Sequence, residues 1–187
     1  MSGPNDHPTD ERMQIPDPPS NPHRAMGRGM ALAASLVVLG MLWLYFSHAL
    51  EVRDNPNRHL AVASGAAELV LKRGSHGHYI FPGEINGHPV TFLLDTGATV
   101  VSVPAHLAGP LGLTPGAYQT SVTANGTVRT RATRVDTLAF GPFVVRNVPA
   151  SLNPGMGDMQ ILLGMSVLRH MEFTQRGDTL ILRPAGG

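Results

Sequence analysis

The feature that most constrains this chain is an apolar run that ends in an acid, with a hydroxyl and a glycine directly after it. Residues 92–94 predict a buried strand, and Asp95, Thr96 and Gly97 follow. An unpaired carboxylate there costs several kcal/mol to bury, so it is expected to hold a proton or to share one. Gly97 allows a tight turn, and the Thr96 hydroxyl can brace that turn. Two such turns, face to face, would place two carboxylates around one proton.

A second motif lies downstream in residues 160–168, where an apolar strand is followed by a glycine and a short helix that ends in leucine. Each motif alone has an ordinary explanation, as a local Asp-Thr-Gly turn or as a core strand capped by glycine. Together, and in this order, they resemble the retropepsin-like aspartic proteases. The hallmark of that family is apolar-apolar-Asp-Thr-Gly-Ala, which residues 93–98 match at every position. The resemblance covers residues 77–184.

The resemblance implies an all-β domain, a retropepsin-like acid protease half-barrel, with Asp95 as its catalytic acid and base. It also gives the neighbouring residues supporting roles. Thr96 would brace two such loops across a dimer axis, and Gly97 would keep the backbone close enough for that brace. Ala98 would pack beneath the loop without crowding it.

Two further segments acquire roles from the same resemblance. The strand that contains Leu162 and Leu163 would lie beside the catalytic loop, and Gly164 would permit a close approach of the two backbones. A hairpin with Asn125 and Gly126 at its tip takes the place of the flap that covers substrate in retropepsins. A peptide substrate would then bind as an extended strand beneath it.

The Asp-Thr-Gly motif occurs once, whereas the chemistry needs two carboxylates that share a proton. A homodimer with twofold symmetry would supply the second one, because it places Asp95 opposite its own copy. If a single chain were active, Asp158 and Asp136 would be the first candidates for the second carboxylate. The mechanism requires no metal and no organic cofactor.

Turn signals recur at short intervals between stretches rich in β-branched residues, which predicts an all-β domain of short strands. The pairs Asn86-Gly87 and Asn125-Gly126 are strong hairpin signals. We expect short helices at residues 104–111 and 165–170. The expected strands are residues 67–71, 79–85, 89–94, 100–103, 118–124, 127–138, 143–148, 160–163, 171–175 and 179–183.

The first 75 residues lie outside the resemblance and divide into three segments by composition. Residues 1–29 are rich in proline and poor in large apolar side chains, so a disordered tail is expected. Residues 30–50 carry no formal charge and span about 30 Å as a helix, the thickness of a bilayer core. Residues 51–75 are polar without a clear period and predict a linker or stalk before a protease domain at 76–187.

The apolar segment predicts a single transmembrane helix. A cleaved signal peptide fits less well because the run is long for one, and a buried soluble helix is disfavoured because the run is apolar all round. The arginines that flank the segment favour a cytoplasmic N-terminus only slightly over the opposite orientation. The family resemblance implies the same orientation: a single-pass protein of the bacterial inner membrane with its protease domain in the periplasm.

Composition excludes several other chemistries. The chain has 14 Lys and Arg against 13 Asp and Glu, so nothing suggests a nucleic-acid surface. It has no cysteine, and no GxSxG elbow or HExxH metal motif occurs. His76 and His78 alternate on an expected strand and could hold a metal weakly, although an exposed pair without function is the better interpretation.

The sequence therefore predicts a membrane-anchored aspartic endopeptidase. Two other classes of function stay open. The first is a catalytically inactive module of the same fold that binds peptides or partners in the cell envelope. The second is a structural envelope protein that uses its tail and stalk as a tether. The intact motif at Asp95 argues against a pure binder, which has no need of a half-buried carboxylate.

Overall fold

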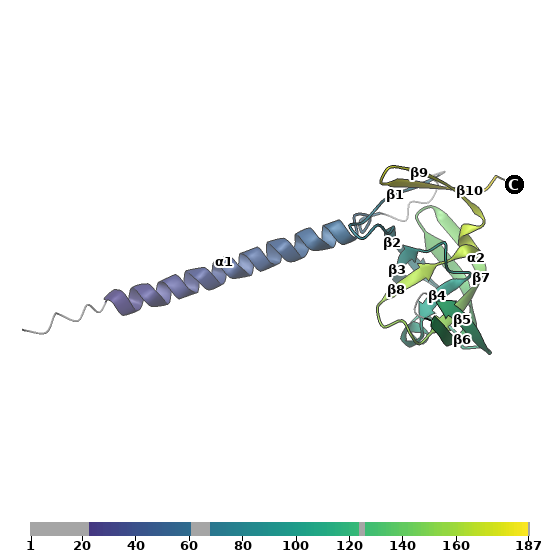
Figure 1. The fold of residues 1–187 in the computed structure, drawn as a ribbon, viewed down its shortest axis with the longest axis horizontal. Helices are drawn as coiled ribbons and strands as arrows, with labels where there is room; N and C mark the ends of the chain where they lie inside the picture. The colour runs from purple at the N-terminus through teal and green to yellow at the C-terminus, as the bar shows by residue number, and fades with distance from the viewer. Residues whose placement is uncertain (1–22, 61–67, 124–125, 187) are drawn as a thin grey trace, which may run out of the picture. The chain divides into compact units, whose positions relative to one another are not determined.

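The structure is a computed structural model that describes residues 23–60, 68–123 and 126–186 (Figure 1). Its internal contacts divide the chain into two units, residues 1–45 and residues 46–187. One long helix, α1 (His23–Asp54), begins in the first unit and ends in the second. The rest of the second unit is mainly β-structure, with the short helix α2 (Met165–Leu168) and a 3₁₀ turn η1 (Ala105–Leu107).

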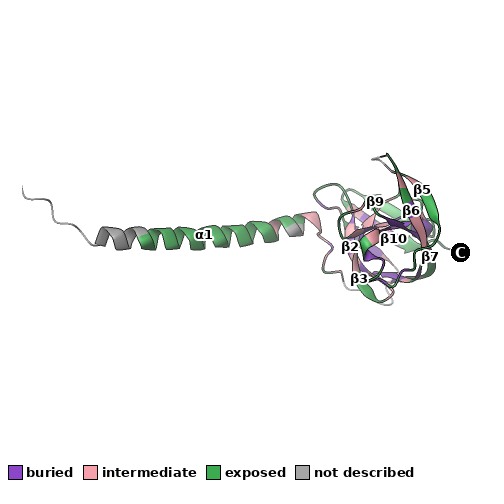
Figure 2. Ribbon diagram, turned by 90° about the horizontal axis from the view of Figure 1, so that it is seen from below, coloured by how far each residue is buried: buried purple, intermediate pink, exposed green. Residues whose placement is uncertain are grey.

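The helix α1 contains the apolar segment that the sequence marks out. Residues Gly29–Leu50 form a stretch of 22 residues with a mean hydropathy of 2.0, long and apolar enough to cross a membrane. The side chains of residues 29–48 are exposed (Figure 2). The helix extends beyond the expected span of 30–50 at both ends. Residues 23–29, which were expected to belong to the tail, are helical, and residues 1–22 lie outside the described residues.

The second unit is built from strands, as the turn pattern predicted (Figure 1). The strands form two sheets: an antiparallel sheet of three strands and a mixed sheet of seven. In the described residues the strands are β1 (Leu69–Lys72), β2 (Ile80–Ile85), β3 (His88–Leu94), β4 (Val101–Pro104), β5 (Tyr118–Thr123), β6 (Gly126–Phe140), β7 (Phe143–Asn153), β8 (Gln160–Leu163), β9 (Met171–Arg176) and β10 (Thr179–Pro184).

The larger sheet closes on itself. Its strand order is β2-β3-β8-β4-β7-β6-β5, and an additional pairing between β2 and β6 joins the first strand to the last but one. A closed sheet has no free edges except at β5, which extends beyond the ring as half of the β5–β6 hairpin. The interior of this barrel-like sheet is apolar, and its aromatic centre is a group of rings whose centroids lie 5.4–6.5 Å apart, from Phe81, Phe92, Phe140 and Phe143.

The first hairpin follows the chemistry of its turn. Asn86 and Gly87 both adopt positive φ angles, 51° and 78°, which a two-residue hairpin loop requires and which these two residue types tolerate best. The side-chain amide of Asn86 also donates through Nδ2 to the Leu111 carbonyl (2.9 Å), and its Oδ1 atom accepts from the backbone amide of Thr137 (3.0 Å). This turn is therefore fixed to two other segments, and the strand that leads to Asp95 starts from a rigid point.

Two local predictions are wrong. The helix expected at residues 104–111 is reduced to the three residues of η1, because Gly109-Pro110 disfavours helix and Gly112 has a φ of 65°. His76 and His78 do not alternate on a strand. They lie in an irregular stretch around Gly77, which has a φ of 82°, and both side chains are exposed.

The segment expected as a linker, residues 51–75, contains ordered structure at both ends. Residues 51–54 complete α1, and β1 pairs with β10 in the smaller sheet. Asn57 is only 4% exposed, and its side chain forms hydrogen bonds with the backbone of β1 and β2. Residues 61–67 lie outside the described residues. The boundaries of the transmembrane segment and of the protease domain stay predictions.

Candidate active site

Asp95 follows directly on β3, where the apolar pattern of residues 92–94 predicted it. The strand is held from both sides: it pairs with β2 in antiparallel and with β8 in parallel fashion. The ladder between β3 and β8 ends at the pair Leu94 and Leu163, and the Asp95 amide donates to the Leu163 carbonyl at 3.1 Å. The backbone of the acid thus continues a strand that is paired on both sides, in which Phe92 is buried while Leu93 and Leu94, also expected to be buried, are half-buried. Such a strand is a rigid support for a side chain.

The turn after Asp95 is closed by the acid itself. The Asp95 Oδ1 atom accepts a hydrogen bond from the Gly97 amide (2.8 Å), and its carbonyl accepts one from the Ala98 amide (3.3 Å). A Cβ atom on Gly97 would lie 3.1 Å from Asp95 Oδ1 and would crowd the carboxylate. The Asp95 and Ala98 side chains are half-buried, whereas Thr96 and Gly97 are exposed. The loop therefore presents its hydroxyl and its glycine outward.

Gly164 is the point where the second motif meets this loop. A Cβ atom at this position would lie 2.4 Å from the Val100 carbonyl oxygen and 2.6 Å from the Ala98 carbonyl oxygen. Real Cβ atoms do not approach backbone oxygens so closely, so only glycine fits between β8 and the loop. Gly164 is buried and extended, with a φ of −94°, so its role is close approach and not a left-handed turn.

The residues after Gly164 hold the far side of the loop. The amides of Met165 and Ser166 donate to the carbonyls of Ala98 (2.8 Å) and Thr99 (3.0 Å). The Ser166 hydroxyl accepts from the Val101 amide (3.2 Å) and donates to the Pro149 carbonyl (3.1 Å). Sequence reasoning missed Ser166, and the one available signal was a hydroxyl two residues after the motif glycine, in a segment that is otherwise apolar.

The comparisons with known proteins agree with this geometry. Residues 81–170 match the family described as "gag-polyprotein putative aspartyl protease". The crystal structure of a retropepsin-like aspartic protease from Rickettsia conorii is similar, with a TM-score of 0.53 and 28% identity over 63% of this chain and 90% of that one. The β-domain has the retropepsin-like fold.

A relative from Sinorhizobium sp., described as an uncharacterized protein in the cobV 5′ region, is 32% identical over 125 residues, which is 65% of this chain. The chain spans about half the length of that relative, 54%. The family match begins in β2 and ends just after α2. It therefore includes both motifs and the β5–β6 hairpin between them.

In this retropepsin-like domain the β5–β6 hairpin lies where the sequence predicted a flap, with Gly126 at its described end (φ 109°). Asn125, the other predicted tip residue, lies outside the described residues. The base of the hairpin is reinforced on both faces. Thr130 is 1% exposed and shares a hydrogen bond with Ser121 (2.9 Å), and the guanidinium of Arg129 lies 3.8 Å from the centre of the Tyr118 ring on the opposite face.

The two other candidate acids belong to parts of the fold other than the Asp95 turn. Asp136 is an exposed residue of β6, and Asp158 is an exposed residue of the loop before β8. Among the described residues, no hydrogen bond joins either of them to Asp95. Nor does any group of three or more His, Cys, Asp or Glu there have the arrangement of a metal site.

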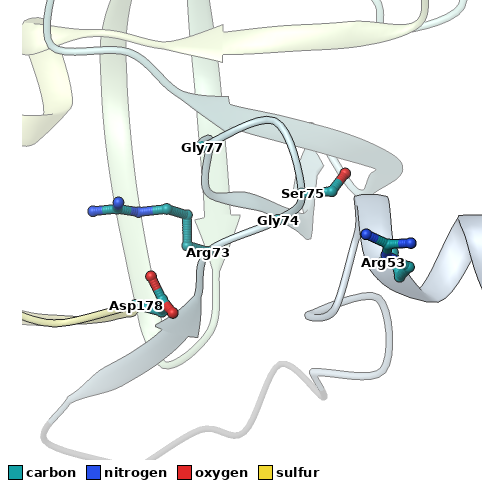
Figure 3. A pocket seen from close by; sticks show the side chains of 6 residues that line it. All are labelled: Arg53, Arg73, Gly74, Ser75, Gly77 and Asp178. Atoms are coloured by element: carbon teal, nitrogen blue, oxygen red, sulfur yellow. The ribbon is translucent and has the colours of Figure 1, made fainter.

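Two hollows in the described part of the chain lie away from the Asp95 loop. One, of about 480 Å³, lies at the end of α1, and none of its residues belongs to β3, the loop or β8 (Figure 3). Another, of about 470 Å³, lies on the β5–β6 hairpin beside Tyr118. The first is lined by Arg53, Arg73, Gly74, Ser75, Gly77 and Asp178.

Proposed function

We propose that this chain is a membrane-anchored aspartic endopeptidase that hydrolyses peptide bonds between the two Asp95 carboxylates of a homodimer. The observation that carries the proposal is the single Asp95 turn, built rigidly onto two strands and yet open toward solvent at Thr96 and Gly97. Those two exposed residues can contact a second copy of the same loop across a twofold axis. The domain contributes one such carboxylate, so a second chain supplies the other.

The chemistry follows from two carboxylates in contact. Like charges at about 3 Å cannot both be ionised, so the pair holds one proton between its members. The ionised member removes a proton from water, and the water oxygen attacks the carbonyl carbon of the peptide bond. The protonated member donates its proton to the carbonyl oxygen, which gives a tetrahedral gem-diol. The first member then delivers the proton it took from water to the leaving nitrogen as the C–N bond breaks, and the second member recovers a proton from a gem-diol hydroxyl. Proton and charge both balance within the dyad, without a metal or a cofactor.

The supporting residues have roles in this proposal that match their positions. Thr96 braces the two loops across the axis, Gly97 leaves the carboxylate uncrowded, and Ala98 fills the space beneath the loop. Gly164, after Leu162 and Leu163, allows β8 to support the loop from below. The β5–β6 hairpin with Gly126 at its end covers a peptide bound as an extended strand.

The apolar helix α1 supports a membrane location for the proposed enzyme. The helix anchors the chain through residues 30–50, in a bacterial inner membrane, with the protease domain on the periplasmic side. Anchoring also raises the local concentration of protomers, which favours the dimer that the half-site needs. A structural or purely binding role gives no reason for the half-buried carboxylate of the Asp95 turn.

The test is incubation of the purified full chain in detergent with a peptide library, at acid and at neutral pH, followed by mass spectrometry of the products. We expect discrete cleavage that a transition-state analogue of the pepstatin type inhibits, and that the Asp95→Asn variant lacks while keeping its fold. Cleavage of the same bonds by Asp95→Asn would contradict the assignment of Asp95. Peptide binding without cleavage by the wild type would instead support the inactive module.

A further inference from the structure

The segment between the apolar helix and the β-domain is bound to the domain at its start. The Ser75 amide donates to the Arg53 carbonyl at 2.9 Å, and the Ser75 hydroxyl donates to the Asp54 carboxylate. The backbone of Gly74 also lies directly against Asp54, because a Cβ atom on this glycine would be 2.5 Å from the Asp54 carbonyl oxygen. Figure 3 shows Ser75 beside the end of α1 that carries Arg53.

Asn57 fixes the chain again three residues later. Its side-chain amide donates to the carbonyls of Lys72 (2.8 Å) and Ile80 (2.9 Å), and its Oδ1 atom accepts from the Lys72 amide (2.8 Å). These bonds join β1 of the smaller sheet and β2 of the larger one through a single side chain that is 4% exposed. An asparagine in this arrangement uses both donors and its acceptor, so it behaves as part of the domain and not as part of a tether.

These bonds leave little free chain between the apolar helix and the β-domain. The apolar stretch ends at Leu50, and the Arg53 carbonyl is bonded to the domain, so only residues 51 and 52, both within α1, lie between them. The stretch from Asn57 to Lys72, including residues 61–67, is held at both ends by the same asparagine. Whatever its length, it adds nothing to the distance that the domain can move away from the apolar helix.

We infer that the cleft acts on peptide segments that lie close to the bilayer surface, which in a membrane-bound substrate are the segments next to its membrane span. This inference rests on the proposed function, which supplies both the anchor and the peptidase activity. A domain of this size is about 35 Å across, so every bond it cleaves lies within roughly that distance of the bilayer surface. A flexible tether of 24 residues would add about 27 Å on average, and the structure replaces such a tether with a docked helix end.

The experiment measures reach with the full chain in proteoliposomes. Two single-span reporters carry a sequence cleaved in the peptide-library assay, placed on rigid Pro-rich spacers of 5 or 16 residues, about 15 and 50 Å long. A soluble peptide with the same sequence reports intrinsic activity. One variant carries a 24-residue Gly-Ser insertion between Glu51 and Val52. The control variant carries the same insertion after Ser64, between the two bonded ends.

We expect the wild type and the control variant to cleave the near reporter at least tenfold faster than the far one. The variant with the insertion after Glu51 should cleave the two within about threefold of each other, because about 27 Å of tether added to the roughly 35 Å of the domain exceeds 50 Å. Equal cleavage of both reporters by the wild type, or an equal gain of reach from the control insertion, would overturn the inference. Loss of soluble-peptide cleavage in every chain would overturn the proposed function, and the inference with it.

Discussion

Gly164→Ala offers the sharpest test of how the two motifs are fitted together. The new methyl group would lie 2.4 Å from the Val100 oxygen and 2.6 Å from the Ala98 oxygen, and both atoms belong to backbone that cannot rotate away. Either β8 or the loop has to move. Such overpacking costs about 1–3 kcal/mol. The shift also weakens the bonds from Met165 and Ser166 to the loop, at about 1 kcal/mol each, so the expected loss is about 3–5 kcal/mol.

The assay is urea unfolding of the full chain in detergent, followed by hydrogen exchange of the amides in β3, β4 and β8. Gly109→Ala is the matched control, because a Cβ atom there meets nothing within 4 Å and Gly109 is exposed. It should change stability by less than about 1 kcal/mol and could raise it, since alanine restricts the unfolded chain. If Gly164→Ala were as stable as Gly109→Ala, the close approach of β8 to the Asp95 loop would be refuted.

Three further outcomes are expected. Asp95→Asn should abolish cleavage while the stability measured by urea unfolding stays within about 1 kcal/mol, because the amide oxygen of asparagine can still accept from the Gly97 amide. Asn57→Ala should lower the unfolding free energy by about 2–4 kcal/mol in the same assay, since three buried hydrogen bonds to Lys72 and Ile80 are lost; a change below about 0.5 kcal/mol would contradict their role. A reporter enzyme fused after Gly187 should be active only on the periplasmic side, and activity confined to the cytoplasm would reverse the proposed orientation.

Local chemistry explains which parts of the fold were predictable from the sequence. The strand at residues 160–163 was predicted with the bounds it has, because its apolar run is short and is ended by a glycine. The turn at Asn86 and Gly87 was predicted because few other residue pairs tolerate two positive φ angles. The Asp95 turn depends on three adjacent residues, so its position could be predicted from the sequence alone.

The parts that were missed depend on partners distant in the sequence. Strand β7 runs to Asn153, five residues beyond its expected end, because β4 and β6 pair with it there. Ser166 and Asn57 each look like ordinary polar residues, and only the backbone groups that surround them in the fold give them a role. Segment 51–75 looked like a linker for the same reason, since its polarity did not reveal that its ends are bonded to the domain.

The central claim is that each chain supplies one of two essential Asp95 carboxylates, and mixing chains tests it most directly. Wild-type and Asp95→Asn chains are combined in equal amounts, allowed to exchange in detergent, and assayed at constant total protein while sedimentation reports the oligomeric state. If both carboxylates are needed, random pairing leaves about a quarter of the wild-type activity, because mixed dimers have one competent acid. Activity that falls only to about half, from a species that sediments as a monomer, would contradict the half-site account.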